Sequence, residues 1–310
     1  MNRLSLLASL LLPAALAVCV TAACSSSTAA GTGSPDASVA SDAGAGGEAD
    51  APAPCTAPPS QRPDGGTCVL EATGTVFDLN GTPLPQLVMT MCSPGLCYGT
   101  QSNDAGVYAV PIGDFLVTSS YAIHADGRPD HGVDYFRLGA NEPQVIAVDM
   151  HLPTLPPSAV HLPPDDGGAA TSVTAGDVTL QIAAGTKFDL DIEDFGTAAG
   201  RTLRVAPVPL ASAPAYAAAN QVDAIYVLAP SGAKPSLPMG VALRNAAGLP
   251  AGSAVDVFVL SDDYFSVPPT VGTLLLQATA HVSADGTTIQ TDPGQGINEI
   301  TWLAVRGRDQ

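Results

Sequence analysis

The stretch that decides the fold is GTVFDLNGTPLP, at residues 74–85, which indicates a strand followed by a tight turn. Residues 73–77 form the predicted strand, and the Asn80-Gly81 pair suits a turn that needs positive φ. From residue 68 onward the chain repeats this alternation of period-two strands and turn residues. Glycine (31) and proline (28) are plentiful, whereas only 13% of the residues are charged, which favours short strands over helices. The sequence therefore predicts an all-β protein.

The first half of the folded chain contains enough strands for a small β-sandwich. The predicted strands are residues 73–77, 87–92, 97–101, 107–110, 115–123 and 146–152. The last of these is the clearest, because Ile146, Val148, Met150 and Leu152 face one way while Asp149 and His151 face the other. We expect residues 55–153 to form one β-sandwich domain, with a long loop from His124 to Tyr135.

Two motifs in this half resemble those of the carboxypeptidase regulatory-like domain, a transthyretin-like β-sandwich. GTVFDLNGTPLP matches its G-x-V-x-D-x-x-G-x-P-L opening, and NDAGVY at residues 103–108 matches its D-x-x-G-x-Y turn with Asn103 in the aspartate place. The resemblance implies glycines at positions that need positive φ, an Asp or Asn that bonds its own turn, and Tyr108 in the core. None of these motif residues is catalytic.

A second β-sandwich is predicted for residues 165–310, after a stiff proline-rich linker at residues 154–164. Its predicted strands are residues 178–182, 203–207, 224–228, 239–243, 254–260, 273–282, 287–291 and 300–305. Residues 178–186 and 225–243 are similar to the β-module shared by ankyrins and netrin receptors. Ala184 stands where that family usually has proline.

The N-terminus carries an export signal. Arg3 is followed by an apolar run at residues 6–16 and by Thr21-Ala22-Ala23-Cys24, which resembles the lipobox of bacterial lipoproteins, with Thr21 in the usual leucine place. The resemblance implies cleavage of residues 1–23 and acylation of Cys24, palmitate included. With Ser25 rather than aspartate next, it implies an outer-membrane lipoprotein that faces the periplasm or the cell surface. Plain secretion and an uncleaved membrane helix are the alternatives.

Residues 24–54 are rich in Ala, Gly, Ser and Asp and contain no aromatic residue, so we expect a disordered tether that holds the folded part clear of the membrane. The full chain has a formal charge of −18, and loss of Arg3 with the signal leaves 10 basic against 29 acidic residues. Such a protein repels nucleic acid.

Four cysteines remain in the predicted mature protein besides Cys24. An even number in an exported chain predicts two disulfides, for which we favour Cys55 with Cys68 and Cys92 with Cys97. The second pair flanks a Pro-Gly turn and would clamp the end of a hairpin. A zinc site is the alternative.

Polar clusters are the candidates for binding. The predicted loop carries His124, Asp126, Asp130, His131 and Asp134, which could ligate calcium or a transition metal, although a solvated loop is the preferred interpretation. A second acidic run, Asp189, Asp191, Glu193 and Asp194, could hold calcium or form a solvated strand edge. Asp262 and Asp263 stand beside an aromatic pair, Tyr264 and Phe265, which we expect to be exposed in a loop; a ligand contact there is the less favoured alternative.

No catalytic motif is present. The chain lacks a G-x-S-x-G nucleophile, a zinc-protease helix and a phosphate-binding glycine loop, so neither enzymatic activity nor a cofactor is predicted. We therefore expect a lipid-anchored, non-catalytic structural or binding module of the cell envelope. The alternatives are a carbohydrate- or protein-binding factor, or an accessory module to a separate enzyme. Against stacking on sugars, aromatic residues are scarce and Trp302 lies where a core role is expected.

Overall fold

The computed structural model of the chain describes residues 55–56, 66–157, 160–163, 168–191 and 199–308. The predicted signal peptide, Cys24 and the tether lie outside these residues. The described part is all-β, as predicted, and its α-helix is the short α1 (Ala215–Ala219). No helix within the described part is both long and apolar enough to cross a membrane.

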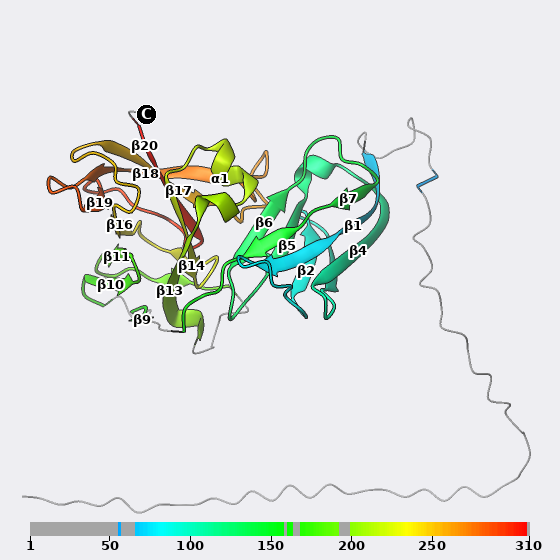
Figure 1. Cartoon of the computed structure of the whole chain (residues 1–310), viewed down its shortest axis with the longest axis horizontal. Coiled ribbons are helices and arrows are strands. Elements are labelled where there is room, and N and C mark those ends of the chain that lie inside the picture. The colour runs from blue at the N-terminus through cyan, green and yellow to red at the C-terminus, as the bar shows by residue number, and fades with distance from the viewer. Residues whose placement is uncertain (1–54, 57–65, 158–159, 164–167, 192–198, 309–310) are drawn as a thin grey trace, which may run out of the picture. The chain divides into compact units, whose positions relative to one another are not determined.

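The first half forms a sandwich of two sheets, seen in Figure 1. In one sheet β1 lies between β4 and β7, and β8 pairs with the far end of β1; in the other the order is β3-β2-β5-β6. The strands are β1 (Thr67–Asp78), β2 (Val88–Cys92), β3 (Cys97–Gln101), β4 (Val107–Leu116), β5 (Ala122–Asp126), β6 (Val133–Arg137), β7 (Val145–Ala147) and β8 (Met150–Leu152).

The motif residues act as turn formers and as sites of close approach. Asp78 Oδ1 accepts the backbone N–H groups of Asn80 and Thr82, both at 2.8 Å, and Gly81 has φ of 81°. Gly74 serves a different purpose from the positive φ that we expected. A Cβ built there would lie 1.8 Å from the carbonyl oxygen of Val148, so only glycine admits this neighbouring backbone.

The predicted strand at residues 146–152 is present as two parts, β7 and β8, that share one register along β1. At the break between them, the Tyr108 hydroxyl donates to the Val148 carbonyl at 2.7 Å, and Asp149 Oδ1 accepts the Thr75 N–H at 2.8 Å. Side chains therefore replace two ladder bonds, and the predicted alternation survives with Met150 buried and His151 exposed.

Two predictions for this half were wrong. Residues 115–123 do not form one strand, because β4 ends at Leu116 and Thr118–Ser120 form a 3-10 helix before β5 begins at Ala122. The Thr118 hydroxyl donates to the Gly139 carbonyl at 2.7 Å, a long-range contact that holds this turn. The predicted loop from His124 to Tyr135 is instead a hairpin, in which β5 pairs with β6.

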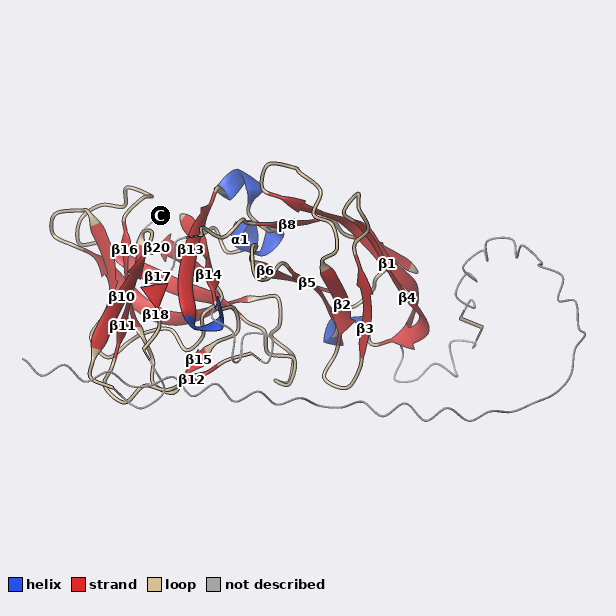
Figure 2. Cartoon of the chain, turned by 90° about the horizontal axis from the view of Figure 1, so that it is seen from below, coloured by secondary structure: helices blue, strands red, loops and turns tan. Residues whose placement is uncertain are grey.

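The second half is a ten-stranded antiparallel sheet that curls around its own core (Figure 2). The strand order is β10-β11-β16-β19-β18-β17-β20-β14-β13-β9, and β10 returns to lie against β13 and β9. The strands are β9 (Val160–His161), β10 (Thr171–Ala175), β11 (Val178–Ile182), β13 (Thr202–Val208), β14 (Ala224–Ala229), β16 (Gly240–Arg244), β17 (Ala254–Leu260), β18 (Leu274–Val282), β19 (Thr288–Thr291) and β20 (Trp302–Gly307).

Every strand predicted for this half is present, with small differences in bounds. A short pair, β12 (Phe188–Asp189) and β15 (Lys234–Pro235), lies outside the large sheet; a strand edge at Asp189 was one of the two interpretations of the acidic run, whereas β15 was not predicted. The same is true of α1 and of the edge strands β9 and β10.

The two halves share an apolar core. Trp302 is fully buried in a cluster that joins Val133 and Tyr135 of the first half to Ile225, Phe258 and other residues on the outer face of the large sheet. The Trp302 indole N–H donates to the Val133 carbonyl at 2.6 Å. The described residues of both halves accordingly belong to one compact unit.

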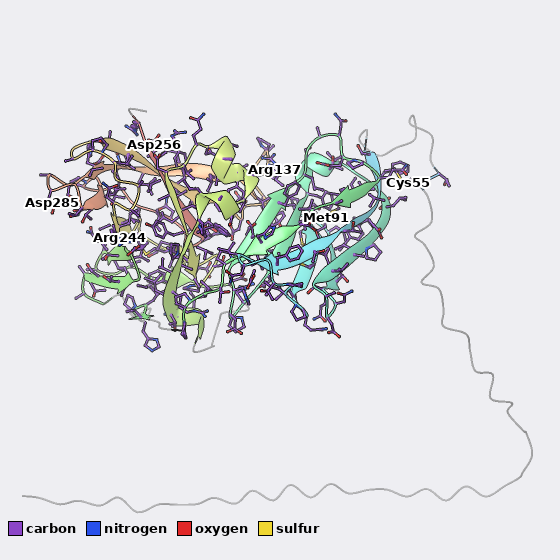
Figure 3. The ribbon with its side chains drawn as sticks, viewed as in Figure 1. Cys55, Met91, Arg137, Arg244, Asp256 and Asp285 are labelled. Atoms are coloured by element: carbon purple, nitrogen blue, oxygen red, sulfur yellow. A yellow bond between two sulfur atoms is a disulfide. The ribbon has the colours of Figure 1, made fainter. Side chains whose placement is uncertain are left out.

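Both predicted disulfides are confirmed. Cys55 is bonded to Cys68 at the start of β1, and Cys92 is bonded to Cys97 across the β2–β3 hairpin. Figure 3 shows Cys55 at the edge of the sandwich, while Met91, next to Cys92, is fully buried in its core.

Replacing Cys92 and Cys97 together by alanine should lower the free energy of unfolding by about 2 kcal/mol, since the bond closes a short loop in the unfolded chain. Replacing Cys55 and Cys68 should cost more, about 3 kcal/mol, because that loop is longer. Denaturant unfolding followed by circular dichroism measures both. A larger loss for the short loop would contradict this ranking.

Candidate functional site

The β5–β6 hairpin separates the five residues that were predicted as metal candidates. His124 and Asp126 lie on one face of the hairpin, because they pair with Tyr135 and Val133, whereas Asp134 points to the other. Asp130 is exposed in the turn, and His131 is half-buried. In the part of the chain that the structure describes, no three His, Cys, Asp or Glu side chains are arranged to hold a metal ion.

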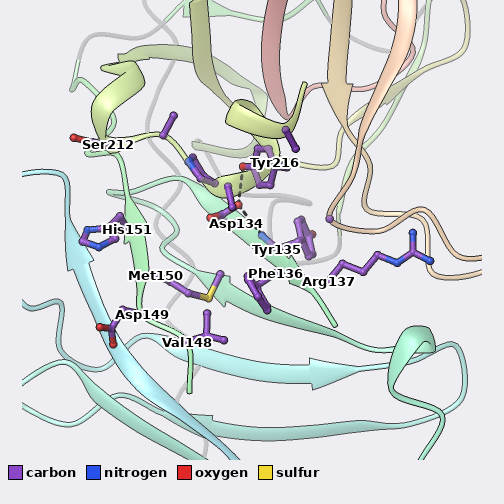
Figure 4. Close-up of a pocket in the computed structure, with 15 residues that line it drawn as sticks. Asp134, Tyr135, Phe136, Arg137, Val148, Asp149, Met150, His151, Ser212 and Tyr216 are labelled. Atoms are coloured by element: carbon purple, nitrogen blue, oxygen red, sulfur yellow. Dashed lines mark hydrogen bonds between the residues drawn. The ribbon is translucent and has the colours of Figure 1, made fainter. Parts of the chain in front are cut away.

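Asp134 instead lies at a pocket of about 370 Å³, shown in Figure 4. The pocket is bounded by β6, by the segment that joins β7 to β8, and by the turn and helix α1 that follow β13. Its lining residues are Asp134, Tyr135, Phe136, Arg137, Val148, Asp149, Met150, His151, Ser212, Ala213, Pro214, Ala215, Tyr216, Ala219 and Gly272.

The carboxylate of Asp134 is the buried polar group of this pocket. The residue is only 5% exposed, and its Oδ1 accepts the Tyr216 hydroxyl and the Tyr135 backbone N–H, each at 2.8 Å. Burial raises its pKa to about 7, against the opposing effect of these two hydrogen bonds. No described residue donates to Oδ2, and this oxygen is not among the fully buried atoms that lack a partner, so it is accessible from the pocket.

The remaining wall is mainly apolar. In Figure 4, Val148, Met150 and Phe136 lie across from the segment that carries Ser212 and Tyr216, and the alanines and Pro214 of that segment also line the pocket. His151 is stacked on Phe77, with ring centroids 5.3 Å apart, and the Arg137 guanidinium points away from Asp134 in Figure 4. Such a cavity can enclose a small molecule with an apolar body and can accept one hydrogen bond deep inside.

Arg128 forms a second polar region on the opposite face of the hairpin. Its guanidinium binds both oxygens of Asp126 and reaches Asp191 Oδ2 at 3.0 Å, and its side chain is 11% exposed. Burial opposes ionisation of Asp126, but the hydrogen bonds and charge of Arg128 outweigh it and lower the pKa of Asp126. Asp191 thus belongs to an ion-pair network. Asp189 pairs with Lys234 in the β12–β15 ladder, and Glu193 and Asp194 lie outside the described residues.

Asp262 extends this region within the second half. It binds Lys234 Nζ at 2.8 Å and shares a hydrogen bond with Glu299, which is only 9% exposed. Burial, and then the negative charge of Asp262, raise the pKa of Glu299 to about 9, so Glu299 is protonated at neutral pH. Burial also lowers the pKa of His124 to about 4.

The predicted exposed aromatic pair is only half present. Phe265 is 78% exposed, as expected, but the Tyr264 ring is half-buried and packs edge-on against Tyr135, with centroids 6.4 Å apart. Its hydroxyl is buried without a hydrogen-bond partner among the described residues.

Sequence reasoning missed Tyr216, Met150 as a pocket wall, and Glu299. Tyr216 lies in an alanine-rich stretch with no motif, and Glu299 precedes a core strand with no acidic neighbour. The one local signal in the sequence is that Glu299 stands directly before the apolar run that begins at Ile300, because a charge next to a core strand needs a partner.

No family model matches the chain, and no curated relative matches it significantly. Among solved structures, a putative carbohydrate binding protein from Bacteroides uniformis ATCC 8492 is similar to this chain at a TM-score of 0.23 and 8% identity. The match covers 78% of this chain and 80% of that one. The resemblances to the carboxypeptidase regulatory-like domain and to the ankyrin and netrin-receptor module stay predictions.

The Glu299 side chain should make stability depend on pH. The pKa of Glu299 in the folded protein lies above the ordinary value of 4.5. The protonated side chain therefore contributes its full stabilisation below pH 4.5, and this stabilisation is lost as the pH rises toward about 9. Glu299→Gln keeps the neutral shape. Between about pH 5 and pH 9 the melting temperature of Glu299→Gln should therefore fall less than that of the wild type. The difference between the two falls should be at least about 3 °C, the equivalent of one pKa unit.

Glu71→Gln, a glutamate of β1 outside this region, is the matched control and should keep the wild-type slope. Equal slopes for the wild type and Glu299→Gln would show that Glu299 is ionised in the folded protein.

Proposed function

We propose that this protein is a lipid-anchored, non-catalytic binding module of the bacterial cell envelope and that its ligand occupies the Asp134 pocket. The observation that carries the binding role is the pocket itself. It has a volume of about 370 Å³, within the range of natural ligand sites, and combines an apolar wall with one buried carboxylate.

The non-catalytic role is supported by the layout of the reactive groups. In the pocket, Asp134 has Tyr216 as its side-chain partner, and the described lining contains no serine or cysteine hydrogen-bonded to a histidine base. The raised pKa of Asp134 puts one strongly shifted carboxyl group in the pocket, whereas His124 and Glu299, whose pKa values are also strongly shifted, lie in the Arg128–Asp262 region and not in this lining.

A screen of small molecules by thermal unfolding tests the pocket. A ligand at ten times its Kd should raise the melting temperature by about 3 to 6 °C. Ala213→Trp, which places an indole at the pocket wall, should abolish the shift. Ala247→Trp, at an exposed turn outside the pocket, should retain it. If a ligand still raises the melting temperature of Ala213→Trp, it binds outside this pocket.

Carbohydrate binding is a second candidate, supported by a separate groove of about 1250 Å³ at the ends of β10, β11, β16, β18 and β19. Gln181, Gln290 and Gln295 line it, together with His281, whose Nδ1 lies 2.5 Å from Asp292 Oδ1. Amide side chains can donate to and accept from sugar hydroxyls. The same thermal screen should include glycans. A rise in melting temperature that is lost in Gln290→Ala but kept in Ala213→Trp would favour glycan binding in this groove.

The anchor is supported by the lipobox-like sequence alone. Cys24→Ala should move the protein from the membrane fraction to the soluble fraction, because stable anchoring needs more than one acyl chain on this cysteine. Intact-mass analysis of the membrane-extracted protein should show these chains on the wild type. Unchanged partitioning of the variant, or an unmodified Cys24, would contradict the lipid anchor and the outer-membrane location inferred from it.

A further inference from the structure

The oxygen of Asp134 that faces the pocket has an unmet bonding capacity. Oδ1 is satisfied by Tyr216 and by the backbone of Tyr135, whereas Oδ2 accepts no hydrogen bond from the described residues. Oδ2 is not among the fully buried side-chain atoms that lack a partner, so it is accessible from the pocket, whose apolar wall supplies no donor. A ligand can therefore donate to Oδ2 without displacing a hydrogen bond within the described residues.

The groups around Asp134 do not supply a compensating cation. Tyr216 approaches it from α1, and Tyr135 and Arg137 flank it on β6. The Arg137 guanidinium points away, and no ion pair joins it to Asp134. From the β7–β8 segment the pocket receives Asp149, whose Oδ1 is bound to the Thr75 N–H, and His151, which is stacked on Phe77. When Asp134 is ionised, its buried negative charge therefore has no cationic partner among the described residues.

The apolar wall limits what else the ligand can be. Val148, Met150 and Phe136 offer no hydrogen bonds, so the body of the ligand must be apolar where it meets them. An engineered cavity of about 150 Å³ holds one benzene molecule. The larger pocket here, about 370 Å³, accommodates a ring together with a short chain.

We propose that the Asp134 pocket binds an organic cation, a protonated amine on an apolar body with about one ring, whose N–H group donates to Asp134 Oδ2. This inference rests on the proposed function and adds the chemical class of its ligand. A charge-assisted hydrogen bond in an apolar site is about twice as strong as a neutral one, which gives the pocket its preference for a cation over a neutral molecule of the same shape.

Three isosteres separate this proposal from simple apolar binding. Calorimetric titration of the full chain in detergent compares phenethylamine, phenethyl alcohol and hydrocinnamate. At pH 8 the amine should bind at least about tenfold more tightly than the alcohol, since 1.4 kcal/mol corresponds to tenfold. Hydrocinnamate should bind the weakest of the three, because its carboxylate meets that of Asp134.

The preference for the amine should also depend on pH. The pKa of Asp134 is raised to about 7, so protonation below that pH removes the charge that the amine binds. The amine affinity should fall up to about tenfold per pH unit between pH 7 and pH 5.5, while the affinity for the alcohol should change less than about twofold. Because this test uses the wild type, it does not depend on any variant folding.

Asp134→Asn should remove the preference for the amine and keep the binding of the alcohol. Asp104→Asn, which changes the net charge equally at an exposed turn, should leave both affinities unchanged. An alcohol or a carboxylate that binds as tightly as the amine would overturn the cationic ligand while leaving the pocket as a binding site. If none of the three binds and no compound in the thermal screen acts through Ala213, the proposed function fails as well.

Discussion

The close approach of two backbones at Gly74 is the constraint on which the rest of the structure depends. The Val148 carbonyl lies where a side chain at residue 74 would be, and the Tyr108 hydroxyl holds it there. This contact fixes where β7 ends and β8 begins. Because Val148 itself lines the pocket, and Met150 and His151 come just after it, one glycine and one tyrosine in the sandwich also determine the position of a pocket wall. A structural motif without reactive groups thus positions the candidate site.

The shared core completes the pocket by holding the other wall. Trp302 fills the space between the outer face of the large sheet and the β5–β6 hairpin, and its N–H group satisfies a backbone carbonyl that would otherwise be buried without a donor. Tyr216 packs edge-on against the same indole, with ring centroids 6.0 Å apart, and donates its hydroxyl to Asp134. The ring of Tyr216 therefore connects buried Trp302 directly to the carboxylate of Asp134.

Much of the fold could be predicted because alternation and turn chemistry are local. Residues 254–260 are an almost continuous apolar run, which gives the bounds of β17 as the structure has them, and Cys92 and Cys97 flank a Pro-Gly turn that favours a hairpin. The predictions were wrong where a contact with a residue far along the chain determines the local structure. The apolar residues 115–123 suggest one strand, but the bond from Thr118 to Gly139 breaks it. The site was largely hidden for the same reason, since Asp134, Met150 and Tyr216 come from three separate segments.

The pocket has one wall from each half of the protein, so a bound ligand affects how strongly the two halves are held together. A molecule that touches both Met150 and the α1 segment adds attraction where the two halves meet. Binding energy of this kind stabilises the closed arrangement relative to any state in which the halves separate. Occupancy would then raise the force needed to pull the two halves apart.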